Sequence, residues 1–152
     1  MGNQVNFKKI TIIYGALIAG VSFFLFFAVT LFGISDFNTN DKTIFSYLVP
    51  TGLIIAFLLS GFFYKKGVNN IDESDELSLK ITKYLTINIL RAAPLEAAGI
   101  LSIAASFMTS NKYYLLFAIL AILLMVFYFP TKNRFMQDVN LTFDDKSKLN
   151  EL

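Results

Sequence analysis

The sequence contains no histidine, no cysteine and no tryptophan, and only 16% of its 152 residues are charged. Without histidine and cysteine, the chain offers no imidazole or thiolate ligand for a metal or haem, no thiol nucleophile, and no Ser/His or Cys/His catalytic arrangement. We therefore expect no cofactor, no metal site and no enzymatic activity. The net charge of +2 is too small to indicate nucleic-acid binding, so no nucleic-acid partner is expected.

Hydrophobic residues make up 55% of the chain, and the mean hydropathy is +0.59. A typical soluble domain is about 45–50% apolar and about 25% charged, so the excess predicts burial in lipid. Crossing a hydrocarbon core about 30 Å thick takes roughly 20 helical residues. The sequence predicts an all-α membrane protein, a single integral membrane domain over residues 1–152, with four spans at residues 10–34, 44–64, 87–110 and 113–131.

The third span contains the only charges expected inside the membrane. Its uncharged stretch, residues 97–111, is too short to cross, so the span must begin near residue 87 and include Arg91 and Glu96. Between them, Pro94 removes one backbone hydrogen bond and favours a bend. We interpret Arg91, Pro94 and Glu96 as an intramembrane polar cluster, with Glu96 ~14 Å beyond residue 87 and close to the midplane.

Three roles are open for Glu96, because a carboxylate at the centre of a spanning helix costs about 2.5–3.5 kcal/mol. It is a structural tie, protonated or paired, or it binds protons or cations, or it binds a cationic small molecule or a lipid headgroup. The other three spans contain no charged residue, which argues against a proton relay within one subunit. The structural role needs a partner such as Arg91 or one of the polar residues of the first two spans: Tyr14, Ser22, Thr51 and Ser60.

An amphipathic interfacial helix is expected at residues 74–86, leading into the third span. Ser74 is its expected cap, and four acidic residues surround that start: Asp72, Glu73, Asp75 and Glu76. The pattern turns Leu77, Ile81, Tyr84 and Leu85 to one face and directs Ser78, Lys80, Thr82 and Lys83 away from it. Two interpretations of the acids are open: docking on a basic surface of a partner protein, or only a favourable interaction with the helix dipole.

Lysine and arginine are distributed very unevenly between the two sides of the predicted topology. With both termini in the cytoplasm, eleven of them lie in or face the inner segments and two, Lys42 and Lys112, lie outside. The positive-inside rule therefore predicts an N-in, C-in orientation, with a polar cytoplasmic tail at residues 132–152.

Small residues mark the expected contacts between helices, because they let two backbones approach closely in lipid. Two such strips occur, one in the first span and one in the third: Gly15, Ala16, Ala19 and Gly20, and Ala98, Ser102 and Ser106.

About half of the chain resembles a family of uncharacterised small bacterial inner-membrane proteins with four spans. The resemblance rests on residues 91–101 (RAAPLEAAGIL), 108–115 (MTSNKYYL) and 130–132 (PTK), with Asp138 and Leu141 beyond them. It implies a multi-pass protein of the bacterial inner membrane and brings no activity. We predict an accessory or assembly subunit of a larger membrane complex, whose partners are the lipid bilayer and other subunits or copies of itself. The alternative is an oligomeric proton- or cation-coupled transport element that uses Glu96.

Overall fold

A computed structural model describes residues 7–31 and 37–150, and in these ranges the chain forms helices and no strand. This confirms the all-α class. The elements are α1 (Phe7–Leu31), α2 (Phe45–Asn69), α3 (Leu77–Thr109), the short 3₁₀ helix η1 (Lys112–Tyr114), α4 (Leu115–Phe127), α5 (Lys132–Asp138) and α6 (Phe143–Asn150).

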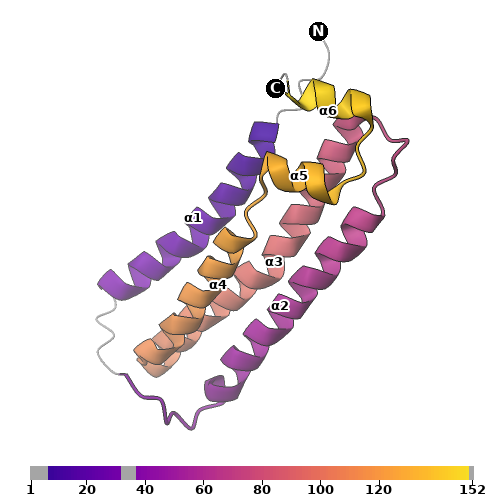
Figure 1. Ribbon diagram of the computed structural model, residues 1–152. Coiled ribbons are helices and arrows are strands. Elements are labelled where there is room, and N and C mark those ends of the chain that lie inside the picture. Colours follow the sequence, from indigo (N-terminus) through magenta and orange to yellow (C-terminus); the bar gives the residue numbers. More distant parts are fainter. Residues whose placement is uncertain (1–6, 32–36, 151–152) are drawn as a thin grey trace.

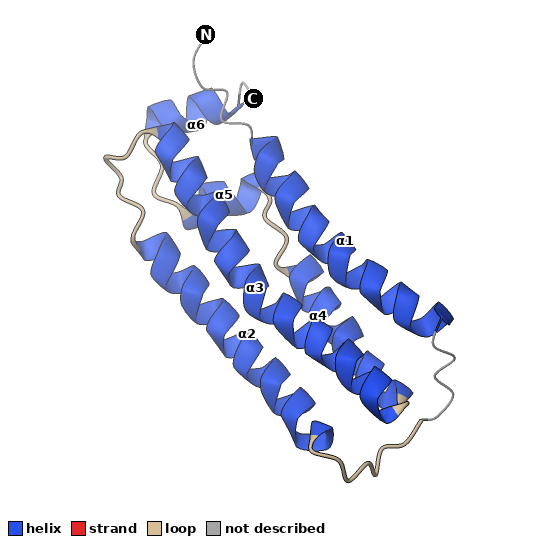
Figure 2. Cartoon of the chain, turned by 180° about the vertical axis from the view of Figure 1, so that it is seen from behind, coloured by secondary structure: helices blue, strands red, loops and turns tan. Residues whose placement is uncertain are grey.

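The four longest helices lie side by side in an elongated bundle (Figure 1). Helices α1 and α3 run in one direction, and α2 and α4 run in the other. Helix α3 lies between α1 and α2 when the bundle is seen from the front and from behind (Figures 1 and 2). Helices α5 and α6 cover the end of the bundle at which α1 and α3 begin. The start of α1 and the whole of α6 therefore lie at the same end of the molecule.

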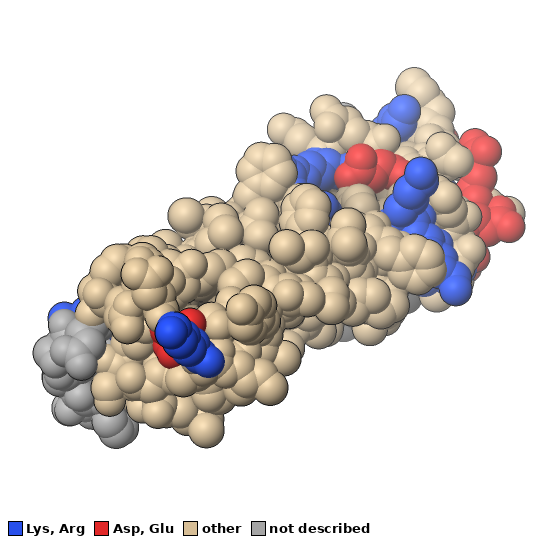
Figure 3. Space-filling view, turned by 90° about the horizontal axis from the view of Figure 1, so that it is seen from below, with Lys and Arg blue, Asp and Glu red and all other residues tan. Residues whose placement is uncertain are grey.

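Three helices, α1, α2 and α3, are long and apolar enough to cross a membrane. A fourth candidate exists only if η1 and α4 are taken together with α5, which is bent away from them by 71°. On the face that Figure 3 shows, charged side chains gather toward the two ends of the molecule, and the surface between them carries no charged side chain. This is the distribution expected of a membrane protein with three, or up to four, candidate spans.

The helix boundaries differ from the predicted spans. Helix α1 begins three residues earlier than residue 10, and residues 32–34 of the predicted span lie outside the described residues. Helix α2 continues to Asn69, five residues beyond the predicted end. Helix α4 ends at Phe127, four residues short of residue 131, because a proline at position 130 cannot donate a helical hydrogen bond and disfavours helical geometry in the residue before it.

The predicted interfacial helix and the third span form one continuous helix. Helix α3 has 33 residues and continues through Pro94. At 1.5 Å per residue its length is about 50 Å, which exceeds the roughly 30 Å of a hydrocarbon core. Helix α3 is therefore longer than a single crossing of a hydrocarbon core requires.

The prediction that Ser74 caps this helix is wrong. Helix α3 begins at Leu77, and the residue in the cap position is Glu76. The Asp72 carboxylate accepts hydrogen bonds from the backbone N–H and the hydroxyl of Ser74, each at 2.9 Å. These bonds lower the pKa of Asp72 and hold residues 72–74 in a turn ahead of the helix.

The segment expected to be a polar tail forms α5 and α6, which pack against the bundle. Four of its apolar side chains are buried, and they form a cluster with Ile10 of α1 and with Ile81 and Tyr84 of α3; the four are Phe135, Val139, Leu141 and Leu149. The sequence pattern missed this packing because these residues are few and are separated by polar and charged ones.

At the opposite end of the bundle, the α3–α4 turn is bonded to the loop before α2. The Asn111 amide accepts a hydrogen bond from the backbone N–H of Asn38 at 3.0 Å and donates one to its carbonyl at 2.8 Å. The Tyr114 hydroxyl donates to the Asp41 carboxylate at 2.6 Å, and this bond lowers the pKa of Asp41. These contacts fix the position of the loop over the ends of α3 and α4.

The turn that ends α3 contains a left-handed serine, Ser110, with φ of 54°. A residue with a Cβ is strained in this conformation, whereas glycine adopts it without strain. We expect Ser110→Gly to stabilise the protein by about 0.5–1 kcal/mol, measured as a higher Tm in detergent. Ser110→Ala is the matched control because it removes the hydroxyl and keeps the Cβ. An equal Tm for the two variants would contradict this explanation.

Candidate functional site

The most developed polar arrangement within the bundle centres on Arg91 of α3. Its guanidinium carbon, Cζ, lies 3.9 Å from the centre of the Tyr64 ring and 3.6 Å from the centre of the Tyr128 ring. Tyr64 belongs to α2, and Tyr128 follows the last residue of α4. The guanidinium therefore lies between two aromatic rings, one from α2 and one from the residue that follows α4, and cation–π attraction stabilises it there.

Both tyrosines are held in place by other contacts. The Tyr64 hydroxyl donates a hydrogen bond to the Asp138 carboxylate of α5 and lies 3.5 Å from the Tyr84 hydroxyl. The Tyr128 ring stacks on the Phe57 ring of α2, with centres 6.4 Å apart and planes at 24°. The stack of Arg91, Tyr64 and Tyr128 is thus a tertiary structure to which α2, α3, the α4–α5 connection and α5 contribute.

Several buried polar atoms near this stack have no hydrogen-bond partner in the described residues. One is the Nε atom of Arg91 itself. The others are the Asn88 Oδ1 atom, one turn earlier on α3, the Ser60 hydroxyl, one turn before Tyr64, and the Tyr14 hydroxyl of α1. The Tyr14 ring packs edge-on against Phe129, the residue after Tyr128. Three helices therefore bring unsatisfied polar groups to the same part of the bundle.

Glu96 does not join this arrangement. In the described part of the chain it makes no ion pair with Arg91 and no hydrogen bond, and its side chain is only partly buried. It lies one turn before Gly99, which packs against Val21 near the middle of α1. Of the partners suggested for it, the Ser22 hydroxyl donates to the Ile18 carbonyl one turn earlier on α1, and within the described residues Tyr14, Thr51 and Ser60 form no bond to Glu96.

The two strips of small residues have different surroundings. Those of α3 are buried inside the bundle, where the Ser102 hydroxyl donates to the Ala98 carbonyl at 2.7 Å and Ser106 is fully covered. In α1, Ala16 and Ala19 are exposed. A Cβ atom added at either glycine of that strip would meet no neighbouring atom within 4 Å; these glycines are Gly15 and Gly20. The α1 strip is thus not covered by another described helix of this chain.

The acidic segment before α3 is partly used inside the molecule. Asp72 is bonded to Ser74, as described above, and Asp75 forms an ion pair with Lys83 at 2.5 Å. The side chains of Glu73 and Glu76 are the exposed ones for which the described residues provide no partner. In this segment, the side chains available for docking on a partner are therefore those of Glu73 and Glu76.

Lys80 was expected to point away from the apolar face, and this is wrong. Its side chain is fully buried, and Nζ donates hydrogen bonds to the Glu73 carbonyl at 2.9 Å and to the Asp145 carboxylate of α6 at 2.7 Å. Lys80 lies one turn before Tyr84, and both side chains are buried. The sequence pattern gave neither the position nor the partner, because it assigned Lys80 to the polar face and Asp145 is 65 residues away.

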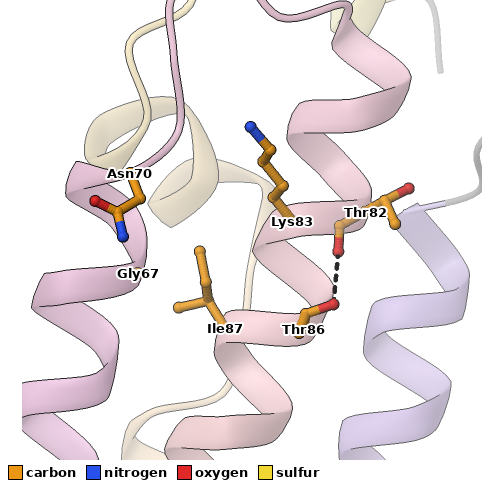
Figure 4. Close-up of a pocket in the computed structure, with 6 residues that line it drawn as sticks. All are labelled: Gly67, Asn70, Thr82, Lys83, Thr86 and Ile87. Atoms are coloured by element: carbon orange, nitrogen blue, oxygen red, sulfur yellow. Dashed lines mark hydrogen bonds between the residues drawn. The ribbon is translucent and has the colours of Figure 1, made fainter.

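A shallow groove of about 320 Å³ lies between the last turns of α2 and the first turns of α3 (Figure 4). Its floor is formed where the Gly67 backbone approaches the Ile87 side chain. On α3 its lining includes Thr86, whose hydroxyl donates to the Thr82 carbonyl. Ile87 is one turn before Arg91, and Gly67 is one turn after Tyr64, so the stack lies one turn deeper along the same α2–α3 contact.

Among the described residues, no group of three or more carboxylates is placed to hold a metal ion. Comparison of the sequence with protein-family models and with curated proteins, and of the structure with solved structures, finds no match.

Proposed function

We propose that this protein is an accessory or assembly subunit of a larger complex in the bacterial inner membrane. The observation that carries the proposal is the uncovered strip of small residues on α1, formed by Gly15, Ala16, Ala19 and Gly20. In lipid, such strips favour close approach of another helix, because dispersion contacts between backbones replace the missing hydrophobic driving force. The strip of the same kind on α3 is already used in this way within the chain.

The position of Glu96 supports a neighbour in the membrane. A partly exposed carboxyl group near mid-depth is costly unless it is protonated or receives a hydrogen bond. A helix of another subunit that supplies a donor or a cation at this depth would remove that cost. The exposed Glu73 and Glu76 provide a second, cytoplasmic contact for a basic partner surface, if the N-in, C-in orientation proposed from the lysine and arginine distribution holds.

The proposal is tested by purification in mild detergent and identification of co-purifying subunits. We expect a stoichiometric membrane subunit with the wild-type chain and at least about a tenfold loss of it in the Ala16→Leu, Ala19→Leu double variant. Thermal stability of the purified chain should be unchanged, because both alanines are exposed. Ile12→Leu is the matched control, since Ile12 is 66% exposed on the same helix and its replacement fills no groove.

The alternative function, an oligomeric transport element, is favoured by the same Glu96, which is the only acidic residue within helices α1 to α4 as the structure describes them. A closed homo-oligomer together with loss of ion transport in Glu96→Gln would establish the alternative. A wild-type chain that purifies as a monomer with no other subunit would contradict both functions.

A further inference from the structure

We propose that the stack of Arg91, Tyr64 and Tyr128 is a binding site for a phosphate group, supplied by a phospholipid headgroup or by free phosphate. This inference is independent of the accessory-subunit proposal. It rests on how the guanidinium is held, on which of its donors are unused, and on the polar atoms around it.

The stacking leaves only the edge of the guanidinium for hydrogen bonding. Both faces are occupied, with Cζ at 3.9 Å from one ring centre and 3.6 Å from the other. A guanidinium donates all its hydrogen bonds in its own plane, in a geometry that matches two oxygens of a phosphate or carboxylate. The two rings therefore fix the orientation of the edge before any ligand binds, which lowers the entropic cost of binding.

Within the described residues, the edge of the guanidinium has no anionic partner. In the described residues Arg91 forms no ion pair, and its buried Nε atom has no hydrogen-bond acceptor. The nearby Asp138 carboxylate instead accepts from the Tyr64 hydroxyl. A buried donor on a permanently charged group is costly to leave unsatisfied, so the geometry points to an acceptor from outside the chain.

Other unpaired polar atoms of α1, α2 and α3 favour a phosphate over a carboxylate as the ligand. The Tyr14 and Ser60 hydroxyls are both buried without a partner in the described residues and are two further potential donors. The Asn88 Oδ1 atom is a free acceptor, because the amide nitrogen of the same residue already donates to the Tyr84 carbonyl at 2.8 Å. A phosphate has four oxygens, which suit several donors, and a hydroxyl on the phosphate or headgroup suits the acceptor.

The position along the bundle favours a source at the membrane surface. Arg91 is only partly buried, and it lies one turn deeper than the groove between α2 and α3. Lys65 and Lys66 follow Tyr64 directly at the end of α2, as expected of a helix end near lipid phosphates.

Two probes separate the two sources. The first is inorganic phosphate, compared with chloride at equal ionic strength. The second is phosphatidylglycerol in mixed micelles, compared with a diacylglycerol of the same acyl chains, which lacks the phosphate. Binding is measured by the shift in Tm and by native mass spectrometry of the purified full-length chain. A response to the lipid alone assigns the headgroup, and a response to inorganic phosphate assigns a soluble ligand; either supports the site.

We expect Arg91→Gln to weaken binding of the effective probe by at least about tenfold. Arg91→Lys keeps the charge and lacks the planar edge, so an intermediate loss of several-fold is expected and the fold is less perturbed. Lys65→Gln removes the same charge next to Tyr64, outside the stack, and should change affinity by less than about twofold. The proposal is overturned if the wild-type chain binds neither probe, or if the Arg91 and Lys65 variants lose affinity equally, because general attraction to anions then explains the result.

Discussion

Replacing Asp145 by asparagine is expected to detach α6 from the end of the bundle. The Asp145 carboxylate is the counter-ion of the fully buried Lys80, at 2.7 Å, and its own side chain is only 10% exposed. Removing one partner of a buried ion pair typically costs about 3–5 kcal/mol, because the other charge stays desolvated. The destabilisation caused by Asp145→Asn cannot exceed the free energy with which α6 docks on the bundle, because undocking of α6 exposes Lys80 to water.

The measurement is hydrogen exchange of the α6 amides, whose protection should fall by roughly a hundredfold in Asp145→Asn while the amides of α3 beyond its first turns stay protected. Asp144→Asn is the matched control. It removes the same charge from the adjacent exposed residue and should cost only about 0.3–1 kcal/mol through the helix dipole. Equal loss of protection in the two variants would show that the buried ion pair does not hold α6.

The same ion pair predicts a dependence on pH. Burial opposes ionisation of Asp145, but hydrogen bonds donated by Lys80 and Thr142 and the positive charge of Lys80 outweigh it, so the pKa lies below the ordinary value of 3.8. A carboxyl group with a lowered pKa stabilises the folded state above its unfolded pKa and loses that effect as the pH falls through the folded one. Protection of α6 should therefore be full above about pH 4 and decline at lower pH, and this decline should be absent in Asp145→Asn.

Gly67→Ala is expected to destabilise the α2–α3 contact, whereas Gly61→Ala on the same helix is not. A Cβ at residue 67 would lie 2.6 Å from the Cγ1 atom of Ile87, which is too close for any real contact. Ile87 is β-branched and has one strongly preferred rotamer in a helix, so it cannot turn aside and the helices must separate. The overpacking cost of about 1–3 kcal/mol exceeds the gain in helix propensity, which is at most about 1 kcal/mol.

Thermal unfolding in detergent measures this difference. At Gly61 an added Cβ meets nothing within 4 Å, so Gly61→Ala should leave Tm unchanged or raise it. Combining Gly67→Ala with Ile87→Ala should recover part of the loss, because the smaller side chain makes room for the new methyl group. If Gly67→Ala and Gly61→Ala shift Tm in the same direction, the close approach of α2 and α3 does not require glycine at residue 67.

The helices of the bundle were predictable because their signals are local. Long uncharged runs and polar loops define α1, α2 and most of α3 from neighbouring residues alone. The end of α4 near Pro130 has a local cause as well, although its position was predicted four residues too late. The start of α3 was misplaced because the sequence pattern does not show that the Asp72 carboxylate accepts hydrogen bonds from Ser74, which hold residues 72–74 in a turn before the helix.

What the sequence by itself determined is the all-α class, the apolar segments and the presence of Arg91 and Glu96 within the third of them. Only the tertiary structure decided that these two residues are not partners. Arg91 stacks on Tyr64 and Tyr128, which lie 27 and 37 residues away, and Lys80 pairs with Asp145, 65 residues away. Periodicity reports which face of a helix is apolar, but it carries no information about which side chain of another helix lies opposite a charge. That depends on the packing of all the helices at once, and it determines whether a charge is left free for a ligand.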